Sequence, residues 1–157
     1  MRTKKIEIDS NNIDMYFYIG CEPYYISANG IMEFPTEIVD FESGFKTKQP
    51  PIELYLKINR PLDEEIKRAL IFVRTLKKIT RANRDITSYG MKHIAEDYFR
   101  KNKIYTAKES DNVYVSNGAF IFAMVQSGFT AYMDNTFRCI PNCYFNVSKK
   151  DLSVHIK

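Results

Sequence analysis

Histidine and the common catalytic signatures are scarce in this sequence. It has two histidines, His93 and His155, and contains no Gly-x-Gly-x-x-Gly, Walker loop, Gly-x-Ser-x-Gly elbow or His-Glu-x-x-His. Those motifs hold dinucleotides or triphosphates, activate a serine, or bind zinc. A magnesium-dependent nuclease would need carboxylates such as Asp9, Asp14 or Glu53 to cluster, and the sequence shows no such cluster. We therefore expect no catalytic residues, no metal site and no cofactor, and hence a protein that is not an enzyme.

Cysteine is also scarce. Cys21, Cys139 and Cys143 are an odd number, and the N-terminal residues lead into the strand-like 5–9 without an apolar signal segment. Both features favour a reducing, cytoplasmic environment. Cys139 and Cys143 are spaced Cys-x3-Cys, but a zinc site would need two further ligands. We predict buried or idle thiols, and the sequence leaves the role of Cys139 and Cys143 open.

No surplus of acidic residues is present. The formal net charge is +4, and residues 61–110 hold twelve Lys and Arg against seven Asp and Glu, a net charge of +5, whereas residues 1–60 carry −2. An acidic mimic of DNA would need the opposite balance, so this role is disfavoured. The basic middle of the chain is the part that favours contact with an anionic partner.

Hydrophobic residues make up 45% and aromatic residues 14% of the 157 positions. A chain of this length is about one domain and can bury a sizeable core. We therefore predict a single domain over residues 1–157, with a β-rich part at 1–60 and a helical part with C-terminal strands at 61–157.

The segment from Val113 to Met133 contains no charged residue. Ser116 is a favourable N-cap, Val115 and Phe120 have the spacing of a hydrophobic staple, and Gly128 can end a helix in the left-handed conformation. Apolar residues on every face indicate a helix over about 116–127 that is enclosed by protein. The alternative, a membrane span, needs about 20 apolar residues, and polar residues and glycines interrupt this run.

The first sixty residues predict a small, mostly antiparallel sheet. Alternating or aromatic stretches at 5–9 and 15–19 indicate strands, and Asn29-Gly30 indicates a hairpin turn between strand-like 24–26 and 31–34. Residues 52–58 alternate apolar and polar side chains, so they predict a further strand.

Pro61 marks a change from strand to helix periodicity. Acidic residues follow it, and apolar residues then recur at helical spacing, so we predict one amphipathic helix over about 62–81. A basic stripe is predicted towards and beyond its end, formed by Arg74, Lys77, Lys78, Arg81 and Arg84. Such a stripe can contact a partner or phosphates, although a solvated helix face is the ordinary alternative.

A second helix is predicted to begin at Thr87 or Ser88, both good caps. Gly90 in its first turn suggests close backbone packing. His93 precedes two carboxylates by three and four residues, which favours a histidine held by a local carboxylate over one used as a general acid or base. A turn at Pro141-Asn142 and a strand at 143–147 complete an α+β fold: a sheet, about three helices and a short C-terminal strand region.

Two motifs carry a family resemblance. They are Ser88-Tyr89-Gly90-x-Lys92-His93 and Tyr114-Val115-Ser116-Asn117-Gly118-Ala119-Phe120-Ile121, followed by Gly128-Phe129. With them, the chain over about 81–147 resembles a family of small proteins carried by phages, plasmids and integrative elements of bacteria. The resemblance implies a setting in which small proteins act against host defence, including anti-CRISPR and antirestriction proteins, or regulate DNA.

The motif residues have the character of caps, close-approach glycines and packing residues, with two exceptions. Lys92 and Asn117 are polar, lie near predicted helix starts and can reach a partner, although local backbone can also satisfy Asn117. We therefore expect the binding residues to be the basic stripe together with Lys92 and Asn117.

The leading hypothesis is a cytoplasmic inhibitor that binds a host CRISPR effector nuclease, or another nucleic-acid-processing defence protein, directly. The alternative is a DNA-binding regulator in which the helices at 87–99 and 116–127 form a helix-turn-helix variant. The apolar second helix disfavours that alternative, because a recognition helix presents polar and basic residues to base edges. The sequence leaves open the target, the oligomeric state and whether the basic residues contact protein, RNA or DNA.

Overall fold

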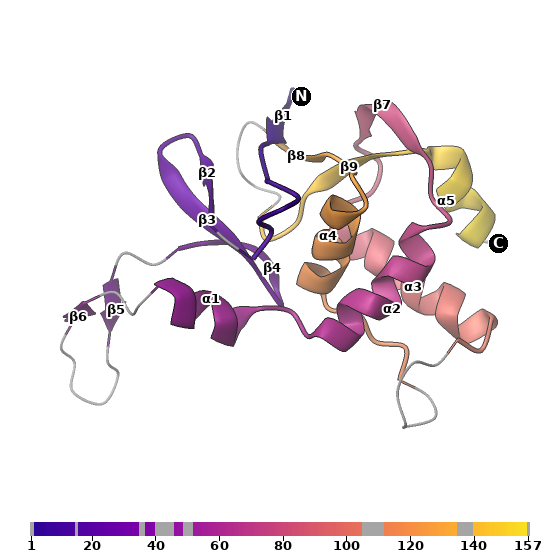
Figure 1. Ribbon diagram of the computed structural model, residues 1–157. Helices are drawn as coiled ribbons and strands as arrows, with labels where there is room; N and C mark the ends of the chain where they lie inside the picture. The colour runs from indigo at the N-terminus through magenta and orange to yellow at the C-terminus, as the bar shows by residue number, and fades with distance from the viewer. Residues whose placement is uncertain are drawn as a thin grey trace.

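The fold is α+β, as the sequence predicts (Figure 1). A computed structural model describes residues 2–14, 16–34, 37–39, 46–48, 52–104, 112–134 and 140–156. Figure 1 shows helix α4 (Asn117–Gln126) at the centre, with a four-stranded sheet above it and helices α2 (Asp63–Val73) and α3 (Ser88–Lys101) below it.

The four-stranded sheet is an antiparallel half-barrel with the strand order β1-β8-β9-β7. Its strands are β1 (Thr3–Ile6), β7 (Lys78–Asn83), β8 (Ala131–Asp134) and β9 (Tyr144–Val147). Strands from the two ends of the chain are therefore neighbours, and β1 and β7 are the two edges. The predicted strand at 143–147 corresponds to β9, whereas the strand predicted at 5–9 overlaps β1 only at residues 5 and 6.

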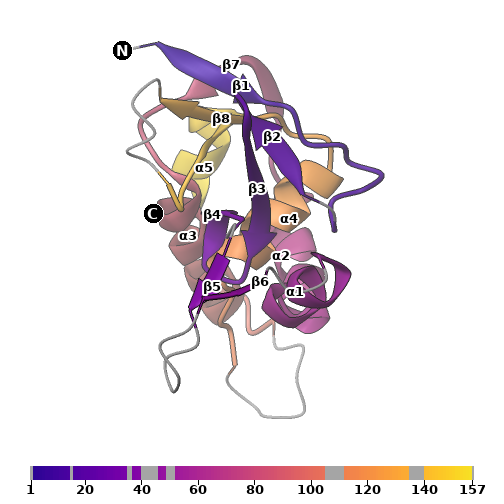
Figure 2. The ribbon, with the colours of Figure 1, turned by 90° about the vertical axis from the view of Figure 1, so that its left-hand side faces the viewer.

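A three-stranded sheet contains β2 (Phe17–Ile19), β3 (Glu22–Ser27) and β4 (Gly30–Glu33). The predicted hairpin is confirmed, but its turn is shifted by one residue: Ser27 pairs with Gly30, so the turn residues are Ala28 and Asn29 and not Asn29 and Gly30. Figure 2 shows β3 and β4 in front of α4, which they contact. A separate hairpin pairs β5 (Glu37–Val39) with β6 (Lys46–Lys48).

Helix α4 confirms the enclosed helix that the sequence predicts. The Ser116 hydroxyl accepts a hydrogen bond from the Ala119 N–H at 3.2 Å, and Gly128 has φ +81° just beyond the helix. Every residue of α4 except Gln126 is buried. No helix in the described part of the chain is long and apolar enough to cross a bilayer.

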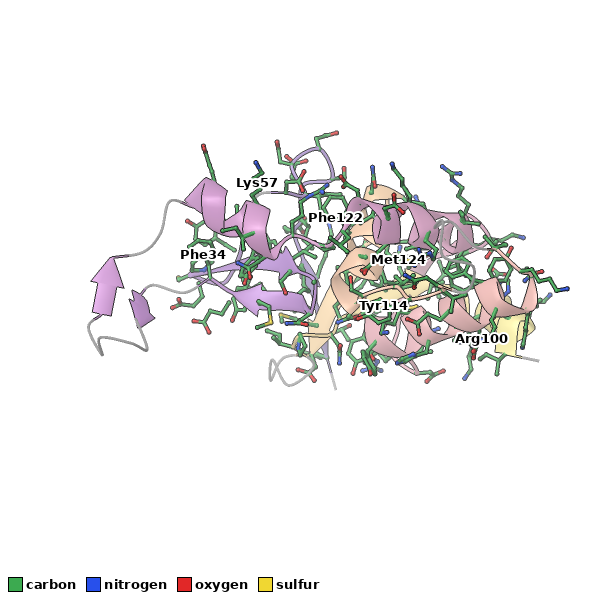
Figure 3. The ribbon with its side chains drawn as sticks, turned by 90° about the horizontal axis from the view of Figure 1, so that it is seen from below. Phe34, Lys57, Arg100, Tyr114, Phe122 and Met124 are labelled. Carbon is green, nitrogen blue, oxygen red and sulfur yellow. The ribbon has the colours of Figure 1, made fainter. Side chains whose placement is uncertain are left out.

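One hydrophobic core joins the N- and C-terminal parts of the chain. It contains Ile6 of β1, Phe72 of α2, Phe120 of α4 and Leu152 of α5 (Lys149–Ile156). The sequence does not predict α5, because residues after 130 have strand-like patches. A smaller cluster of Tyr25, Phe34 and Leu56 lies apart from this core. Figure 3 shows Phe34 and Lys57 near one end of the molecule and Arg100 near the opposite end.

The strand predicted over 52–58 is wrong, because Ile52–Asn59 forms helix α1. Alternate residues lie on opposite sides of a helix, and accordingly Leu56 is buried while Ile58 is 71% exposed. Leu56 packs with Tyr25 and Phe34. A helix can place Leu56 in this contact as well as a strand can. The alternating pattern of 52–58 therefore did not decide the conformation.

The single helix predicted over 62–81 is also wrong. Helix α2 ends at Val73, where the Thr75 hydroxyl donates to the Phe72 carbonyl oxygen at 2.7 Å. The chain then enters β7, in which Lys78 pairs with Val147 of β9. Residues 74–81 have a local preference for helix, but 78–83 pair with β9, a strand nearly seventy residues away. The energy of this pairing outweighs the local helix propensity.

Helix α3 confirms the second predicted helix, but Ser88 does not cap it. Thr87 is the N-cap residue, without a side-chain hydrogen bond, and the Ser88 hydroxyl accepts from the Cys143 N–H at 3.2 Å. Gly90 is closely packed as expected, because a Cβ there would lie 2.7 Å from Cγ1 of Ile86.

The environment of His155 in α5 predicts that the stability of the fold depends on pH. Its ring lies 5.0 Å from the Phe72 ring and 5.1 Å from the Tyr98 ring, and burial lowers its pKa below the ordinary 6.5, with Asp151 opposing the shift and Lys101 adding to it. The folded state therefore favours the neutral imidazole, and this contribution is present above about pH 6.5 and is lost as the pH falls through the folded-state pKa.

We expect the free energy of unfolding to fall between about pH 7.5 and pH 5 by more in the wild type than in His155→Gln. Urea denaturation of both proteins at the two pH values measures this difference. Equal losses would show that His155 does not couple pH to stability.

Candidate functional site

The predicted basic stripe is not one surface, because its residues follow the end of α2, a turn and β7 instead of one helix. Arg74 is the exposed C-cap residue of α2, and Lys77 is exposed in the turn before β7. Lys78 places its ammonium 5.6 Å from the centre of the Phe129 ring. The five cations therefore do not form the single stripe that one helix would give them.

Arg81 in β7 and Arg84 just after it lie near Arg2, which precedes β1 at the opposite edge of the half-barrel. Together they line a groove of about 450 Å³, which we call the basic groove, with Thr3, Thr80, Ala82 and Tyr132. None of these lining residues is acidic. Arginine, threonine and tyrosine side chains are common donors to phosphate oxygens, so the groove has the chemistry of an anion-binding surface.

Lys92 and Asn117 lie together in a second cavity, of about 550 Å³, which we call the tyrosine pocket. The N-terminal part of α3 and the start of α4 meet there with the β3–β4 turn. Its lining residues are Ala28, Asn29, Tyr89, Lys92, His93, Glu96, Tyr114, Asn117, Pro141 and Asn142. The two motifs, far apart in the sequence, therefore form one cavity.

The floor of the tyrosine pocket holds a buried ion pair. Lys92 Nζ lies 3.0 Å from Glu96 Oε1, and the two residues are 4% and 8% exposed. The same Oε1 accepts a hydrogen bond from the Val115 N–H at 3.0 Å, and Oε2 lies 2.8 Å from His93 Nδ1. His93 is thus held by a local carboxylate, as predicted.

Two tyrosine rings flank the Lys92 ammonium. Nζ lies 5.3 Å from the centre of the Tyr89 ring and 4.8 Å from that of Tyr114, within the range of cation–π attraction. The residues Tyr89 and Tyr114 are 51% and 53% exposed, so about half of each is open to solvent. Tyr114 lies beside α3, away from both ends of the molecule (Figure 3). The pocket therefore has aromatic walls around a polar floor.

Charged side chains fix the backbone that enters the pocket. The Arg68 guanidinium donates to the Tyr114 carbonyl oxygen, and Glu65 Oε2 accepts from the Ser116 N–H at 3.0 Å. Both come from α2, whereas Glu96 on α3 holds the Val115 N–H. Helices on both sides thus anchor three consecutive residues before α4.

Asn117 is buried, with its amide group directed to the opposite wall. Its Nδ2 donates to the Asn29 carbonyl oxygen at 3.0 Å and to Asn142 Oδ1 at 2.9 Å. Its Oδ1 is the buried side-chain polar atom without a hydrogen-bond partner in the described part of the chain. Local backbone therefore does not satisfy this side chain, and one acceptor at the pocket remains unused.

Close backbone approach brings these elements together. The Gly118 N–H donates to the Ala28 carbonyl oxygen at 3.0 Å, and the Ile31 N–H donates to the Pro141 carbonyl oxygen at 2.9 Å. A Cβ on Gly118 would lie 1.6 Å from the Ser27 carbonyl oxygen. The glycine therefore lets α4 begin directly against the hairpin turn.

The two described cysteines, Cys21 and Cys143, belong to no candidate metal site. Cys21 is exposed and Cys143 is buried, whereas Cys139 lies outside the described residues. Among the residues that the structure describes, no group of three or more His, Cys, Asp or Glu could hold a metal ion.

No protein-family model, curated protein or solved structure matches the chain. The family resemblance of the two motifs therefore stays a prediction.

The sequence pointed to Lys92 and Asn117 but missed their surroundings. Tyr89 was expected to pack, and instead about half of it is exposed at the pocket. The sequence indicates Glu96 only as a carboxylate near His93, and no sequence pattern links Arg2 with Arg81 and Arg84. The i,i+4 spacing of Lys92 and Glu96 was the one local signal of the ion pair.

Proposed function

We propose that this protein is a mobile-element inhibitor of host defence that binds a nucleic-acid-processing nuclease, most specifically a CRISPR effector, in the bacterial cytoplasm. The observation that supports it is the basic groove, which Arg2, Arg81 and Arg84 line together and whose lining residues include no Asp or Glu. The resemblance of the two motifs to proteins of phages and plasmids supplies the biological setting.

The groove suits the nucleic acid that such an effector holds. Guanidinium groups bind phosphate oxygens with two hydrogen bonds, and hydroxyl groups such as those of Thr3 and Tyr132 add further donors. Contacts of this kind position a backbone and carry little sequence information. An inhibitor that acts on one effector with many guides needs binding of this sequence-independent kind.

The alternative of a helix-turn-helix regulator has less support. Its second helix would be α4, whose residues 117–125 are all buried. A recognition helix must offer a solvent-exposed face to the major groove. Burial of α4 among α2, α3 and the hairpin leaves no such face.

The basic groove predicts which arginines matter. We expect Arg2→Glu with Arg81→Glu to weaken partner binding by at least about tenfold, because two phosphate contacts are replaced by repulsion. Arg74→Glu with Lys77→Glu is the matched control, since it makes the same charge change outside the groove lining. Co-purification with purified effector nucleases, and their rate of target cleavage, measure the effect.

Equal effects of the two double variants would contradict the groove as the contact surface. Failure to bind or inhibit any nuclease across a broad panel would overturn the inhibitor proposal. Binding to free duplex DNA distinguishes the regulator, which would bind without a nuclease and would lose affinity with salt, with a log-log slope of about −0.9 for each phosphate contacted.

A further inference from the structure

The tyrosine pocket has a size and chemistry that the proposed function does not use. Its volume of about 550 Å³ is within the range of small-molecule sites, about 300–1,000 Å³. Its floor holds a buried ion pair, although apolar residues of similar volume often stabilise a fold as well or better. The ion pair also anchors the backbone before α4, and a polar floor under two half-exposed aromatic rings offers chemistry that a ligand can use.

Asn117, which lines the pocket, carries a buried hydrogen-bond acceptor. The amide orientation of Asn117 is fixed, because its Nδ2 faces the oxygens of Asn29, Asn142 and Pro141. Oδ1 consequently points away from those acceptors and has no donor among the described residues, and Asn117 is only 5% exposed. A buried acceptor without a donor is costly, so a ligand N–H would be favourable there.

Lys92, which also lines the pocket, carries a hydrogen-bond donor. An ammonium carries three N–H groups, and in the described residues Lys92 Nζ has one hydrogen-bond acceptor, Oε1 of Glu96. Nζ also lies 5.3 Å and 4.8 Å from the centres of the Tyr89 and Tyr114 rings, and Lys92 lines the cavity. A ligand oxygen or ring nitrogen can accept from the remaining N–H groups.

We propose that the tyrosine pocket binds a nucleobase. A base is planar and can stack on Tyr89 or Tyr114, and its edge carries acceptors next to N–H donors, which match Lys92 and Asn117. A neutral ring also preserves the charge balance of the buried pair. A carboxylate or phosphate at the same position would be repelled by Glu96, which lines the cavity beside Lys92.

Nucleosides test the pocket without the basic groove, because they carry no phosphate. The experiment is an NMR titration of the full chain with adenosine, guanosine, cytidine and uridine, and with pentanucleotides of each base. We expect saturable binding of at least one base, accompanied by a shift of the Asn117 side-chain amide signals. If no nucleoside and no pentanucleotide binds, or if the Asn117 amide signals stay unchanged at saturation, the proposal is overturned.

Variants of the walls locate the site. We expect Tyr89→Ala and Tyr114→Ala each to weaken binding by about tenfold, a typical loss when a stacking ring is removed. Tyr18→Ala is the matched control, because Tyr18 is a similarly exposed tyrosine, at 57%, on β2 outside the pocket. Tyr89→Leu and Tyr114→Leu remove the aromatic ring but retain the bulk of the side chain. The proposal would be contradicted if all these variants bound nucleosides with the affinity of the wild type.

The same titration shows whether the base belongs to a free nucleoside or nucleotide or to a single strand. Tighter binding of nucleosides than of pentanucleotides identifies a free nucleoside or nucleotide as the ligand, whereas the reverse order identifies a base of a single strand. Arg2→Glu with Arg81→Glu should leave nucleoside binding unchanged. Loss of nuclease inhibition in that variant with retained nucleoside binding would therefore show that the two proposals succeed or fail independently.

Discussion

Gly118→Ala is expected to lower the free energy of unfolding by more than about 3 kcal/mol. A Cβ at this position would lie 1.6 Å from the carbonyl oxygen of Ser27 and 2.6 Å from its carbonyl carbon. Both atoms belong to backbone in the paired part of the hairpin, so no side-chain rotation relieves the clash. The start of α4 must then move away from the hairpin turn, with loss of core packing. Urea denaturation followed by circular dichroism measures the change.

Gly20→Ala is the control for the glycine substitution. Gly20 has φ +67°, and a Cβ there would meet no atom within 4 Å. The left-handed conformation alone should therefore cost about 1–2 kcal/mol. A loss in Gly118→Ala no greater than that in Gly20→Ala would show that close approach between α4 and the hairpin is not what requires glycine.

Glu96→Gln is expected to destabilise the fold by about 3–5 kcal/mol, because it leaves the buried Lys92 ammonium without its counter-charge. Lys92→Met should cost less, since the Glu96 carboxylate retains hydrogen bonds with the Val115 N–H and with His93. In the double variant Lys92→Met with Glu96→Gln, part of the loss should be recovered. The difference between the double variant and the two single variants gives the coupling energy of the pair.

An exposed ion pair on the same helix provides the comparison. Asp97 and Arg100 also pair on α3, but both side chains are 60% exposed. Asp97→Asn should therefore change the free energy of unfolding by less than about 1 kcal/mol. If Glu96→Gln lowered the free energy of unfolding by no more than Asp97→Asn, the buried pair would not stabilise the fold more than the exposed pair.

Elements with signals inside one short window were predicted well. Helix α4 has its cap at Ser116 and its stop at Gly128, and both features act over three or four residues. The β3–β4 hairpin was predicted from Asn29-Gly30, although its turn residues are Ala28 and Asn29 and Gly30 is the first residue of β4. Helix α3 was predicted to begin at Thr87 or Ser88, and Thr87 is its N-cap residue.

The candidate site was predicted only in part. Lys92 and Asn117 were correctly placed near helix starts, but their burial and the cavity between them depend on the packing of α3, α4 and the hairpin. The basic residues were assigned to a helix that stops at Val73. The residues near Arg81 in the sequence do not indicate Arg2 as a neighbour. Arg2 lines the same groove from the opposite edge of the half-barrel.

By itself, the sequence determined the α+β class and the buried helix that begins at Ser116, because caps, glycines and an uncharged segment act through neighbouring residues. Only the tertiary structure decided that 52–59 is a helix, that 78–83 is a strand and that the two motifs share one cavity. Those outcomes depend on contacts between residues far apart in the chain, such as Leu56 with Tyr25 and Lys78 with Val147. The free energy of such contacts exceeds the small differences in local propensity, so short-range patterns cannot rank the alternatives.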